Sequence, residues 1–275
     1  NGHMPELLLS QSRFIADGSE LPEDEGLLWQ IPLLRGPPPL GSSRELMITS
    51  TVALNVAGGS TPWIKFNFGQ GGPYRVHYAS KDLRTRLEDA VRRGEVAGVD
   101  RVGILLDSLA ICRTGAQPVS ELLELLSAFS NETNAHVWEA LSAVLGSLHR
   151  AIQFLNNGTV ASRLQSALAN ALVRPALKQF GFGKPNDEDL VRQRSALVVG
   201  LAARFLPKDP EVVREARARL KRWLSDPGSS ALPDDLKGSV FRIALQNSKG
   251  GDVYRDLLRK ARAPRTPQAV RLSIF

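Results

Sequence analysis

Cysteine, long apolar runs and aromatic side chains are all scarce in this chain. One cysteine, Cys112, stands among 275 residues. No disulfide can form within the chain, and we expect this thiol to be a small buried hydrophobic group on a helix. No run of about 18 apolar residues, the length that spans a membrane, is present. Aromatic residues make up only 6% of the sequence, which leaves few rings to stack on nucleic-acid bases. These absences exclude a disulfide scaffold, favour a cytoplasmic protein and give no membrane partner.

Motifs of enzyme chemistry are missing as well. The sequence has no H-E-x-x-H, G-x-S-x-G, P-loop or C-x-x-C motif. His136 and Glu139 stand three residues apart and could share a metal ion, but no further ligands cluster with them, which favours an ordinary polar pair. The glycine-rich Gly69–Gly72 joins two predicted strands, which favours a hairpin turn over a phosphate-binding loop. We therefore expect no catalytic residue, no metal ligand and no cofactor in this chain.

The charge of the chain is strongly positive. There are 35 lysine and arginine residues against 28 aspartate and glutamate residues, a formal charge of +7. Such a charge can indicate a nucleic-acid partner. The two densest basic runs, 214–222 and 255–265, fall on amphipathic helical patterns with acidic residues among them. Solvated helix faces explain these runs better, and we expect no nucleic-acid partner.

The periodicity of the sequence changes near residue 80. Before it, short stretches rich in β-branched and aromatic residues are separated by glycine, proline and aspartate, as strands are. Around residue 65, Trp63, Lys65 and Asn67 alternate with apolar side chains, the pattern of a half-buried strand. The predicted strands are Leu7–Leu9, Leu27–Ile31, Leu46–Val52, Trp63–Phe68 and Tyr74–Tyr78.

From about Ser80 onward the apolar period is helical. We expect Ser80 to cap the first helix, Asp100 to cap the second, and Gly115 to follow the end of the second. Thr266-Pro267 predicts the start of the last helix. The helices after the second are predicted at about 119–129, 137–154, 160–180, 188–206, 211–225, 234–246, 252–262 and 267–275.

The predicted fold is a small antiparallel β-sandwich followed by an all-α superhelical solenoid of the HEAT or armadillo kind. Many amphipathic helices with short connections are typical of stacked antiparallel helix pairs. We interpret residues 1–4 as a tag remnant, 5–79 as the sandwich and 80–275 as the helical-repeat domain. Because the sandwich has few strands and no C-cap follows Phe275, we expect its first strand and the end of the helical domain to lie outside this sequence.

Motifs along nearly the whole chain resemble those of one enzyme family. In the strand region they are Ser10–Phe14, Trp29–Pro32, Trp63–Asn67 and Tyr74–Tyr78 with the two residues before it, similar to T-Q-x-R-F, W-x-I-P, W-x-K-x-N and G-Y-Y-R-V-N-Y. In the helical region they are Asp100-Arg101, Asp107, Leu109, Gly115, Asn131-Glu132 and Val137-Trp138. In this order and spacing they resemble the family of puromycin-sensitive aminopeptidase, aminopeptidase N and the endoplasmic-reticulum aminopeptidases, which are gluzincin metallopeptidases. The chain departs from the pattern at Pro73 and His77.

The resemblance implies the C-terminal half of a zinc-dependent aminopeptidase that removes N-terminal residues from peptides. Such an enzyme has a β-saddle, a thermolysin-like catalytic domain with its zinc, a β-sandwich and a helical bowl. This chain corresponds to the last two domains, so the resemblance implies a piece that has no zinc and no activity of its own. The bowl encloses the substrate cavity and gates access to the catalytic domain. The implied partners are peptide substrates and the parent's own catalytic domain.

One substrate-binding pair is implied by the resemblance. In the endoplasmic-reticulum members a Tyr-Lys pair contacts the C-terminal end of the peptide, and His149-Arg150 falls at the corresponding position. A guanidinium suits a carboxylate because it donates two parallel hydrogen bonds. The alternative is that Arg150 only faces solvent. For the whole chain, the alternative is a free-standing helical-repeat scaffold that binds a partner protein and has no enzymatic activity.

Overall fold

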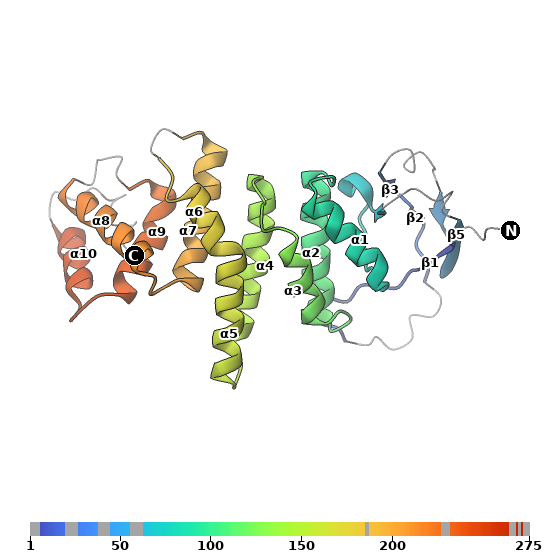
Figure 1. Ribbon diagram of the computed structural model, residues 1–275, viewed down its shortest axis with the longest axis horizontal. Coiled ribbons are helices and arrows are strands. Elements are labelled where there is room, and N and C mark those ends of the chain that lie inside the picture. The colour runs from blue at the N-terminus through green and yellow to red at the C-terminus, as the bar shows by residue number, and fades with distance from the viewer. Residues whose placement is uncertain are drawn as a thin grey trace. The chain divides into compact units, whose positions relative to one another are not determined.

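The computed structural model describes residues 6–19, 27–37, 45–55, 63–184, 187–226 and 232–263, together with Gln268 and Arg271. The chain forms two compact units, Asn1–Asn131 and Glu132–Phe275. The first unit holds the strands and the first three helices, and the second unit is helical (Figure 1). Within the described ranges, no helix is both long and apolar enough to cross a membrane.

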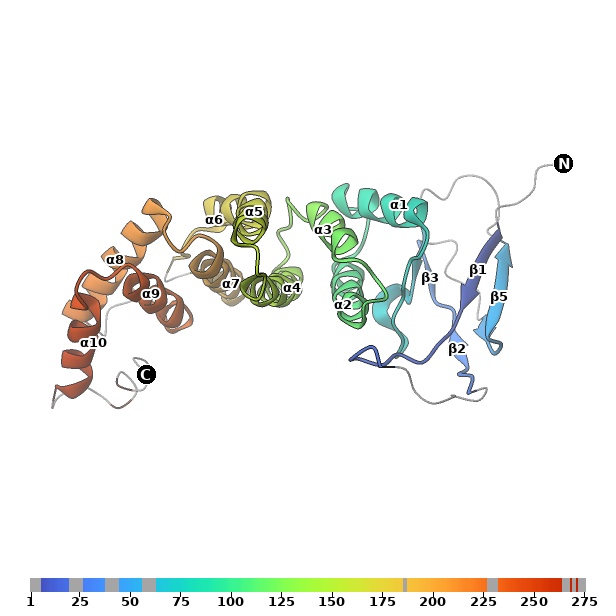
Figure 2. The same ribbon diagram turned by 90° about the horizontal axis from the view of Figure 1, so that it is seen from below.

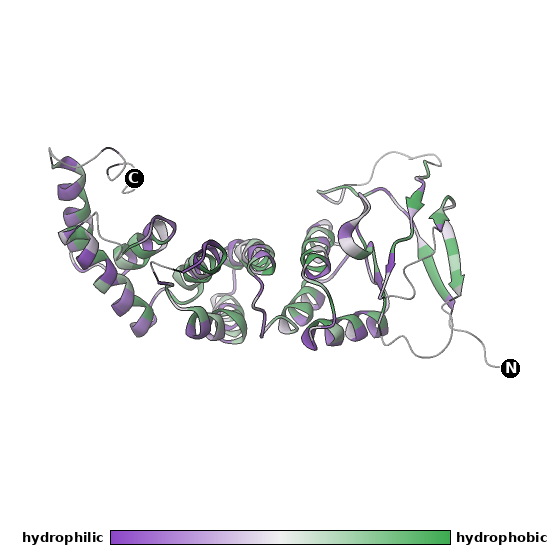
Figure 3. Ribbon diagram, turned by 90° about the horizontal axis from the view of Figure 1, so that it is seen from above, coloured by the Kyte–Doolittle hydropathy of each residue, from purple (hydrophilic) through white to green (hydrophobic). Residues whose placement is uncertain are grey.

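Short antiparallel strand pairs make up the β-structure of the first unit. β1 (Glu6–Ser10) pairs with β5 (Thr51–Asn55), β2 (Ile31–Pro32) with β4 (Leu46–Met47), and β3 (Arg35–Gly36) with β6 (Lys65–Phe66). Among the described residues these are three separate two-stranded sheets. A small core, formed by Leu33, Met47, Leu54, Ile64 and Phe66, lies between them. The strands near the N-terminal end are largely hydrophobic in colour in Figure 3. The β-sandwich itself stays a prediction.

The structure corrects several of the predicted strands. Tyr74–Tyr78 forms no strand, and of Leu27–Ile31 only Ile31 is in one. The turn at Gly69–Gly72 is therefore not a hairpin, and the chain forms the 3-10 helix η2 (Phe68–Gln70) there. Of the segment Trp63–Asn67 only Lys65–Phe66 is a strand, and all five of its residues are buried. The prediction of a half-buried strand was wrong because both faces of this segment are covered.

Three helices complete the first unit: α1 (Lys81–Arg92), α2 (Gly98–Thr114) and α3 (Val119–Ser127). The Ser80 cap is confirmed, since its hydroxyl accepts a hydrogen bond from the Leu83 N–H at 3.4 Å. The Asp100 cap is wrong, because α2 already begins at Gly98 and Asp100 is buried inside the first turn. Gly115 follows α2 with a φ of 82°, a left-handed conformation that glycine adopts without strain. Cys112 is half-buried rather than buried, and burial raises the pKa of its thiol.

The second unit is built of helices that match the predicted ranges to within a few residues. They are α4 (Ala135–Gln153), α5 (Gly158–Leu168), the π-helical η3 (Ala169–Val173), α6 (Arg174–Phe180), α7 (Asp189–Phe205), α8 (Pro210–Ser225), α9 (Asp234–Gln246) and α10 (Asp252–Arg262). The single helix predicted over 160–180 is thus three consecutive helical segments. The helix predicted at 267–275 falls outside the described residues, apart from Gln268 and Arg271.

The helices of the second unit lie in two layers. α4 packs on α7, and α7 packs on α9, and these three helices lie side by side in one layer in Figure 2. α5, α6 and α8 form the other layer in the same view. Two tryptophans fill the core between the helices: Trp138 is 1% exposed and Trp223 is fully buried, with its ring centroid 5.2 Å from that of Phe241. This packing fixes which faces of α4, α7 and α9 meet.

Candidate functional site

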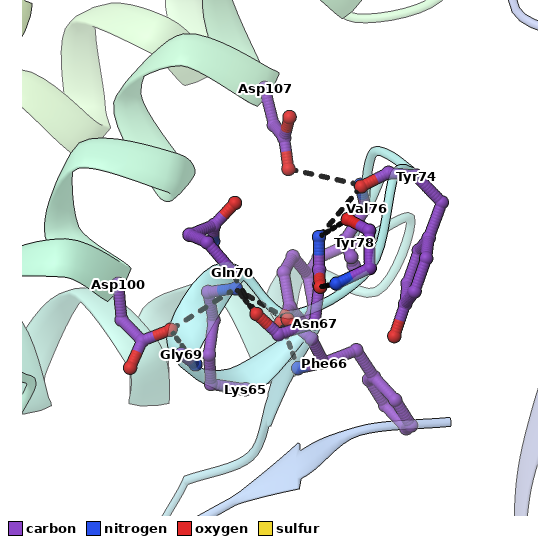
Figure 4. A network of polar contacts seen from close by, with 11 residues as sticks. Lys65, Phe66, Asn67, Gly69, Gln70, Tyr74, Val76, Tyr78, Asp100 and Asp107 are labelled. Atoms are coloured by element: carbon purple, nitrogen blue, oxygen red, sulfur yellow. Dashed lines mark hydrogen bonds and ion pairs between the residues drawn. The ribbon is translucent and has the colours of Figure 1, made fainter. Parts of the chain in front are cut away.

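A buried polar network in the first unit contains several of the motif residues. Lys65 is 1% exposed and Asp100 is fully buried, and the Lys65 Nζ lies 3.8 Å from the Asp100 Oδ1 (Figure 4). Lys65 also donates hydrogen bonds to the main-chain carbonyls of Phe66 and, at 3.3 Å, Asn67. Asp100 accepts a hydrogen bond from the Gly69 N–H at 2.8 Å. Burial lowers the pKa of the Lys65 ammonium, although the charges of Asp100 and a second aspartate oppose this.

Asn67 holds the turn that follows β6. Its backbone is left-handed, with a φ of 51°, which asparagine tolerates better than most residues. Its side-chain amide donates to the carbonyls of Gly72 and Tyr74 at 2.9 and 2.8 Å and accepts from the Gly72 N–H at 2.8 Å. These three hydrogen bonds to one side chain take the place of the backbone hydrogen bonds that a hairpin would form. An asparagine at this position therefore has a structural explanation.

Asp107 ties the extended segment 74–78 to α2. Its carboxylate accepts from the Val76 N–H at 3.1 Å and pairs with the Arg75 guanidinium at 3.1 Å. Burial raises the pKa of Asp107 more than these hydrogen bonds lower it. The Tyr78 hydroxyl accepts from the Phe66 N–H at 2.9 Å, and burial raises the pKa of this phenol. The carboxylates and the ammonium thus contact the main chain, so this network positions the backbone, although the Asp100 Oδ2 is buried without a hydrogen-bond partner among the described residues.

A small cavity lies beside this network. Its volume is about 40 Å³, and it is lined by groups of both signs, among them Lys65, Arg84, Asp107 and Glu121. The Arg84 guanidinium already pairs with the Glu121 carboxylate at 2.7 Å. A cavity of this size holds a few water molecules at most, since about 10–15 Å³ of volume measured for the centre of a water is enough for one molecule. It cannot admit a peptide.

No metal centre is found within the ranges that the structure describes. No group of three or more histidine, cysteine, aspartate or glutamate side chains there could hold a metal ion. His136 and Glu139 are both exposed on α4. This pair is an ordinary surface pair in the structure, which fits the simpler of the two interpretations of its spacing.

The predicted pair His149 and Arg150 lies near the end of α4. Arg150 is exposed, whereas His149 is half-buried with its ring centroid 5.3 Å from that of Phe205. The His149 Nδ1 is buried and has no hydrogen-bond partner among the described residues. Burial is the main cause of a lowered pKa of His149, and the positive charges of Arg204, Arg242 and Arg150 lower this pKa further.

Two arginines that the sequence analysis missed join this pair. Arg204 is half-buried on α7, and Arg242 is exposed on α9. Burial and the charges of Arg242 and Arg150 lower the pKa of the Arg204 guanidinium. A Cβ placed on Gly146, one turn before Arg150, would lie 3.0 Å from an Arg204 Nη1 and 3.8 Å from an Arg150 Nη1. The absence of a side chain at Gly146 thus lets the two guanidinium groups meet over α4.

No sequence signal could have found this cluster of four, which we call the arginine cluster (His149, Arg150, Arg204 and Arg242). Arg204 and Arg242 lie dozens of positions from the adjacent His149 and Arg150 and from each other, and they share no motif with that pair. Only the packing of α4 on α7 and of α7 on α9 brings them together. The cluster concentrates positive charge at one place on the second unit, and charge of that kind binds anions.

The structure thus defines a mostly helical class of domain with small antiparallel strand pairs and a buried polar network in its first unit. Comparison with known proteins then gives the family: a family model described as "ERAP1-like C-terminal domain" matches residues 63–274. That match covers most of the chain, and the chain belongs to this family. Its helical character and its motifs agree with that membership.

Full-length relatives of the chain are aminopeptidases. The chain is 28% identical to "Aminopeptidase M1-B" of Oryza sativa subsp. japonica, over 93% of this chain and 30% of the relative. It is 27% identical to "Aminopeptidase 2" of Candida albicans, over 90% of this chain and 26% of that protein. It is 22% identical to "Endoplasmic reticulum aminopeptidase 1" of Mus musculus, over 86% of this chain and 25% of that protein. The chain thus spans less than a third of the length of these curated relatives, and it is identified as a C-terminal region of the M1 aminopeptidase kind.

Proposed function

We propose that this chain is the non-catalytic C-terminal region of a zinc-dependent aminopeptidase that removes N-terminal residues from peptides. One observation carries the proposal: nearly the whole chain aligns with aminopeptidases, yet it spans only 30% of the rice relative. The chain has no H-E-x-x-H motif, so the zinc and the reaction belong to a catalytic domain elsewhere in the parent. On this account the chain alone is inactive. We also place the parent in the cytoplasm.

The role that we propose for the chain is to enclose the substrate cavity and gate access to the catalytic domain. Residues 5–79 would form a β-sandwich spacer, and residues 80–275 a helical-repeat bowl. The two layers of helices in the second unit support the repeat architecture (Figure 2). A curved stack of helix pairs is the usual way to build an extended concave binding surface.

Exposed apolar side chains on the strands and on the segments beside them support a contact with the parent's catalytic domain. Large hydrophobic residues with 42–75% exposure gather on this part of the first unit: Leu8, Leu27, Leu28, Trp29, Leu46 and Ile48. The Gln11 amide donates to the carbonyls of Trp29 and Thr49 at 3.1 and 2.9 Å, which brings two of their segments together. Exposed apolar groups that gather on one part of a surface commonly mark an interaction site.

We further propose that His149 and Arg150 bind the C-terminal end of the peptide substrate. The pair lies where the positive charge of the second unit is concentrated, because Arg204 and Arg242 lie beside it. A peptide carboxylate would accept two parallel hydrogen bonds from a guanidinium.

Zinc content and peptidase activity test the proposal. The native protein, captured from its source cells with an antibody to this chain, should carry zinc and release N-terminal residues from peptides. The 275-residue chain alone should do neither. A native protein without zinc and without activity would favour the free-standing scaffold instead, and peptidase activity of the isolated chain would contradict the proposal directly.

A further inference from the structure

The arginines of the arginine cluster differ from many arginines of this chain in having no acidic partner among the described residues. No ion pair or side-chain hydrogen bond of Arg150, Arg204 or Arg242 occurs among the described residues, whereas many other arginines pair with carboxylates. Arg174, for example, lies 2.6 Å from Asp209. Arginines without acidic partners are common singly, but here three of them, two exposed and one half-buried, converge from three helices.

Close helix packing explains the convergence. A Cβ on Gly200 of α7 would lie 3.5 Å from the Ser239 Oγ of α9, so the two helices approach closely there. Arg204 and Arg242 follow these positions by four and three residues, which is about one helical turn. Gly146 provides the same close approach between Arg204 and α4. Glycine and serine at the crossing points therefore hold the three guanidinium groups near one another.

The arrangement is electrostatically unfavourable in the absence of an anion. Each cation lowers the pKa of its neighbours, and the two more buried groups, His149 and Arg204, both show this effect. One guanidinium fork satisfies one carboxylate with two hydrogen bonds. Three guanidinium groups therefore provide more donors and more charge than a single carboxylate uses.

We propose that His149, Arg150, Arg204 and Arg242 form a binding site for a compact anion that carries two or more oxyanion groups. Two sources share this chemistry: a peptide whose C-terminal residue is acidic, and a free inorganic anion such as pyrophosphate. The peptide source rests on the proposed function, whereas the free anion does not. The neighbouring carboxylates of a C-terminal glutamate would be held by different arginines, so the site selects acidic peptide ends over neutral ones.

Titration of the 275-residue chain with pyrophosphate tests the site itself. The His149 imidazole is followed by NMR, because a bound anion must raise its pKa from the lowered value of the free protein. We expect saturable binding that weakens as salt is added. Arg150→Gln and Arg242→Gln, both at exposed positions, should each weaken binding about tenfold or more.

A matched control separates a site from general positive charge. Arg214 is also an exposed helical arginine of the second unit, with a side chain that is 75% exposed, and Arg214→Gln removes the same charge. Its affinity for pyrophosphate should equal that of the unaltered chain. An equal loss in the Arg214 and Arg150 variants, or the absence of saturable binding of both pyrophosphate and a peptide with an acidic C-terminal residue, would overturn the proposal.

Peptides distinguish the two sources. A peptide that ends in glutamate is compared with the same peptide ending in glutamine and with its C-terminal amide. If the glutamate peptide is the only one of the three peptides that binds, and pyrophosphate competes with it, the result supports the peptide source. If pyrophosphate binds and none of the three peptides does, the result supports the free anion. Binding of neither overturns the site. Failure of the proposed function is separate: a native protein without peptidase activity would leave pyrophosphate binding intact.

Discussion

At the scale of single residues, the buried network of the first unit and the arginine cluster of the second unit arrange their charges in opposite ways. In the buried network of the first unit, each charge has a partner, and Lys65 lies between Asp100 and two carbonyls. In the arginine cluster of the second unit, like charges converge, and the charges that shift the pKa values of His149 and Arg204 are all those of arginines. The first design stabilises a fold, and the second is suited to a ligand. Substitutions should therefore affect stability in the buried network and the pKa of His149 in the arginine cluster.

Replacement of Lys65 by methionine should destabilise the protein by about 3 kcal/mol or more, because it leaves the buried charge of Asp100 without its cation. Lys81→Met, at an exposed position on α1, should change the free energy of unfolding by about 0.5 kcal/mol at most. Urea unfolding measures both. The Lys65→Met/Asp100→Asn double variant should lose less than the sum of the single variants, and strict additivity would argue against a direct interaction.

His149 should titrate below its ordinary pKa of about 6.5 in the folded protein, because burial and three arginines disfavour its charge. Arg242→Gln should raise this pKa toward the ordinary value, and Arg214→Gln should leave it unchanged. NMR of the imidazole protons against pH gives the pKa directly. An ordinary pKa in the unaltered chain would show that the arginines do not act on His149.

The same shift predicts a pH dependence of stability. The folded state binds the His149 proton less tightly than the unfolded state, so the unfolded state carries more protons in the window between the two pKa values. Stability should therefore fall as the pH drops from about 6.5 toward the lower folded-state value. His149→Gln should remove this part of the slope in unfolding experiments at several pH values.

At the scale of elements, capping residues define where helices begin. Asp209 caps α8: its carboxylate accepts from the Glu211 and Val212 N–H groups at 3.0 and 3.2 Å and pairs with Arg174 of α6 at 2.6 Å. Burial alone would raise the pKa of Asp209, but the hydrogen bonds from Arg174 and Val212 lower it overall. One side chain thus both begins α8 and ties it to α6.

Asp209→Ala should lower the free energy of unfolding by about 1–2 kcal/mol, the usual cost of a lost N-cap. Asp209→Asn keeps the cap, loses only the ion pair and should cost less. Because the folded-state pKa is lowered, the contribution of this carboxylate is present above about pH 3.9 and lost as the pH falls below it. Urea unfolding at neutral and acid pH measures both effects, and equal costs for alanine and asparagine would contradict the capping role.

Helices were easier to predict from sequence than strands for a physical reason. The amphipathic period of α8 and α9 spans three or more turns, and their predicted ranges match the structure to within a residue. The segment Tyr74–Tyr78 has the composition of a strand, yet its backbone hydrogen bonds go to the Asn67 and Asp107 side chains. A long-range partner of that kind leaves no periodic trace. The motif residues were visible as a pattern, but their buried positions required the structure.

At the scale of the whole molecule, site prediction was limited in the same way. His149 and Arg150 came from resemblance to a family, and their role stays a prediction. Arg204 and Arg242 contribute from helices far along the chain, and only the stacking of α4, α7 and α9 places them beside that pair. A site assembled across repeats of this kind cannot be read from local spacing. The family match over 63–274 gives the molecular context in which the cluster would act.

The central claim is that this chain is the C-terminal region of a larger zinc aminopeptidase. Its most direct test is peptide mapping by mass spectrometry of the native protein, captured from source cells with an antibody to this chain. The account predicts a much longer chain with an H-E-x-x-H motif upstream of these residues. A native protein of about 30.0 kDa, the mass of this chain, or a long one without that motif, would contradict it.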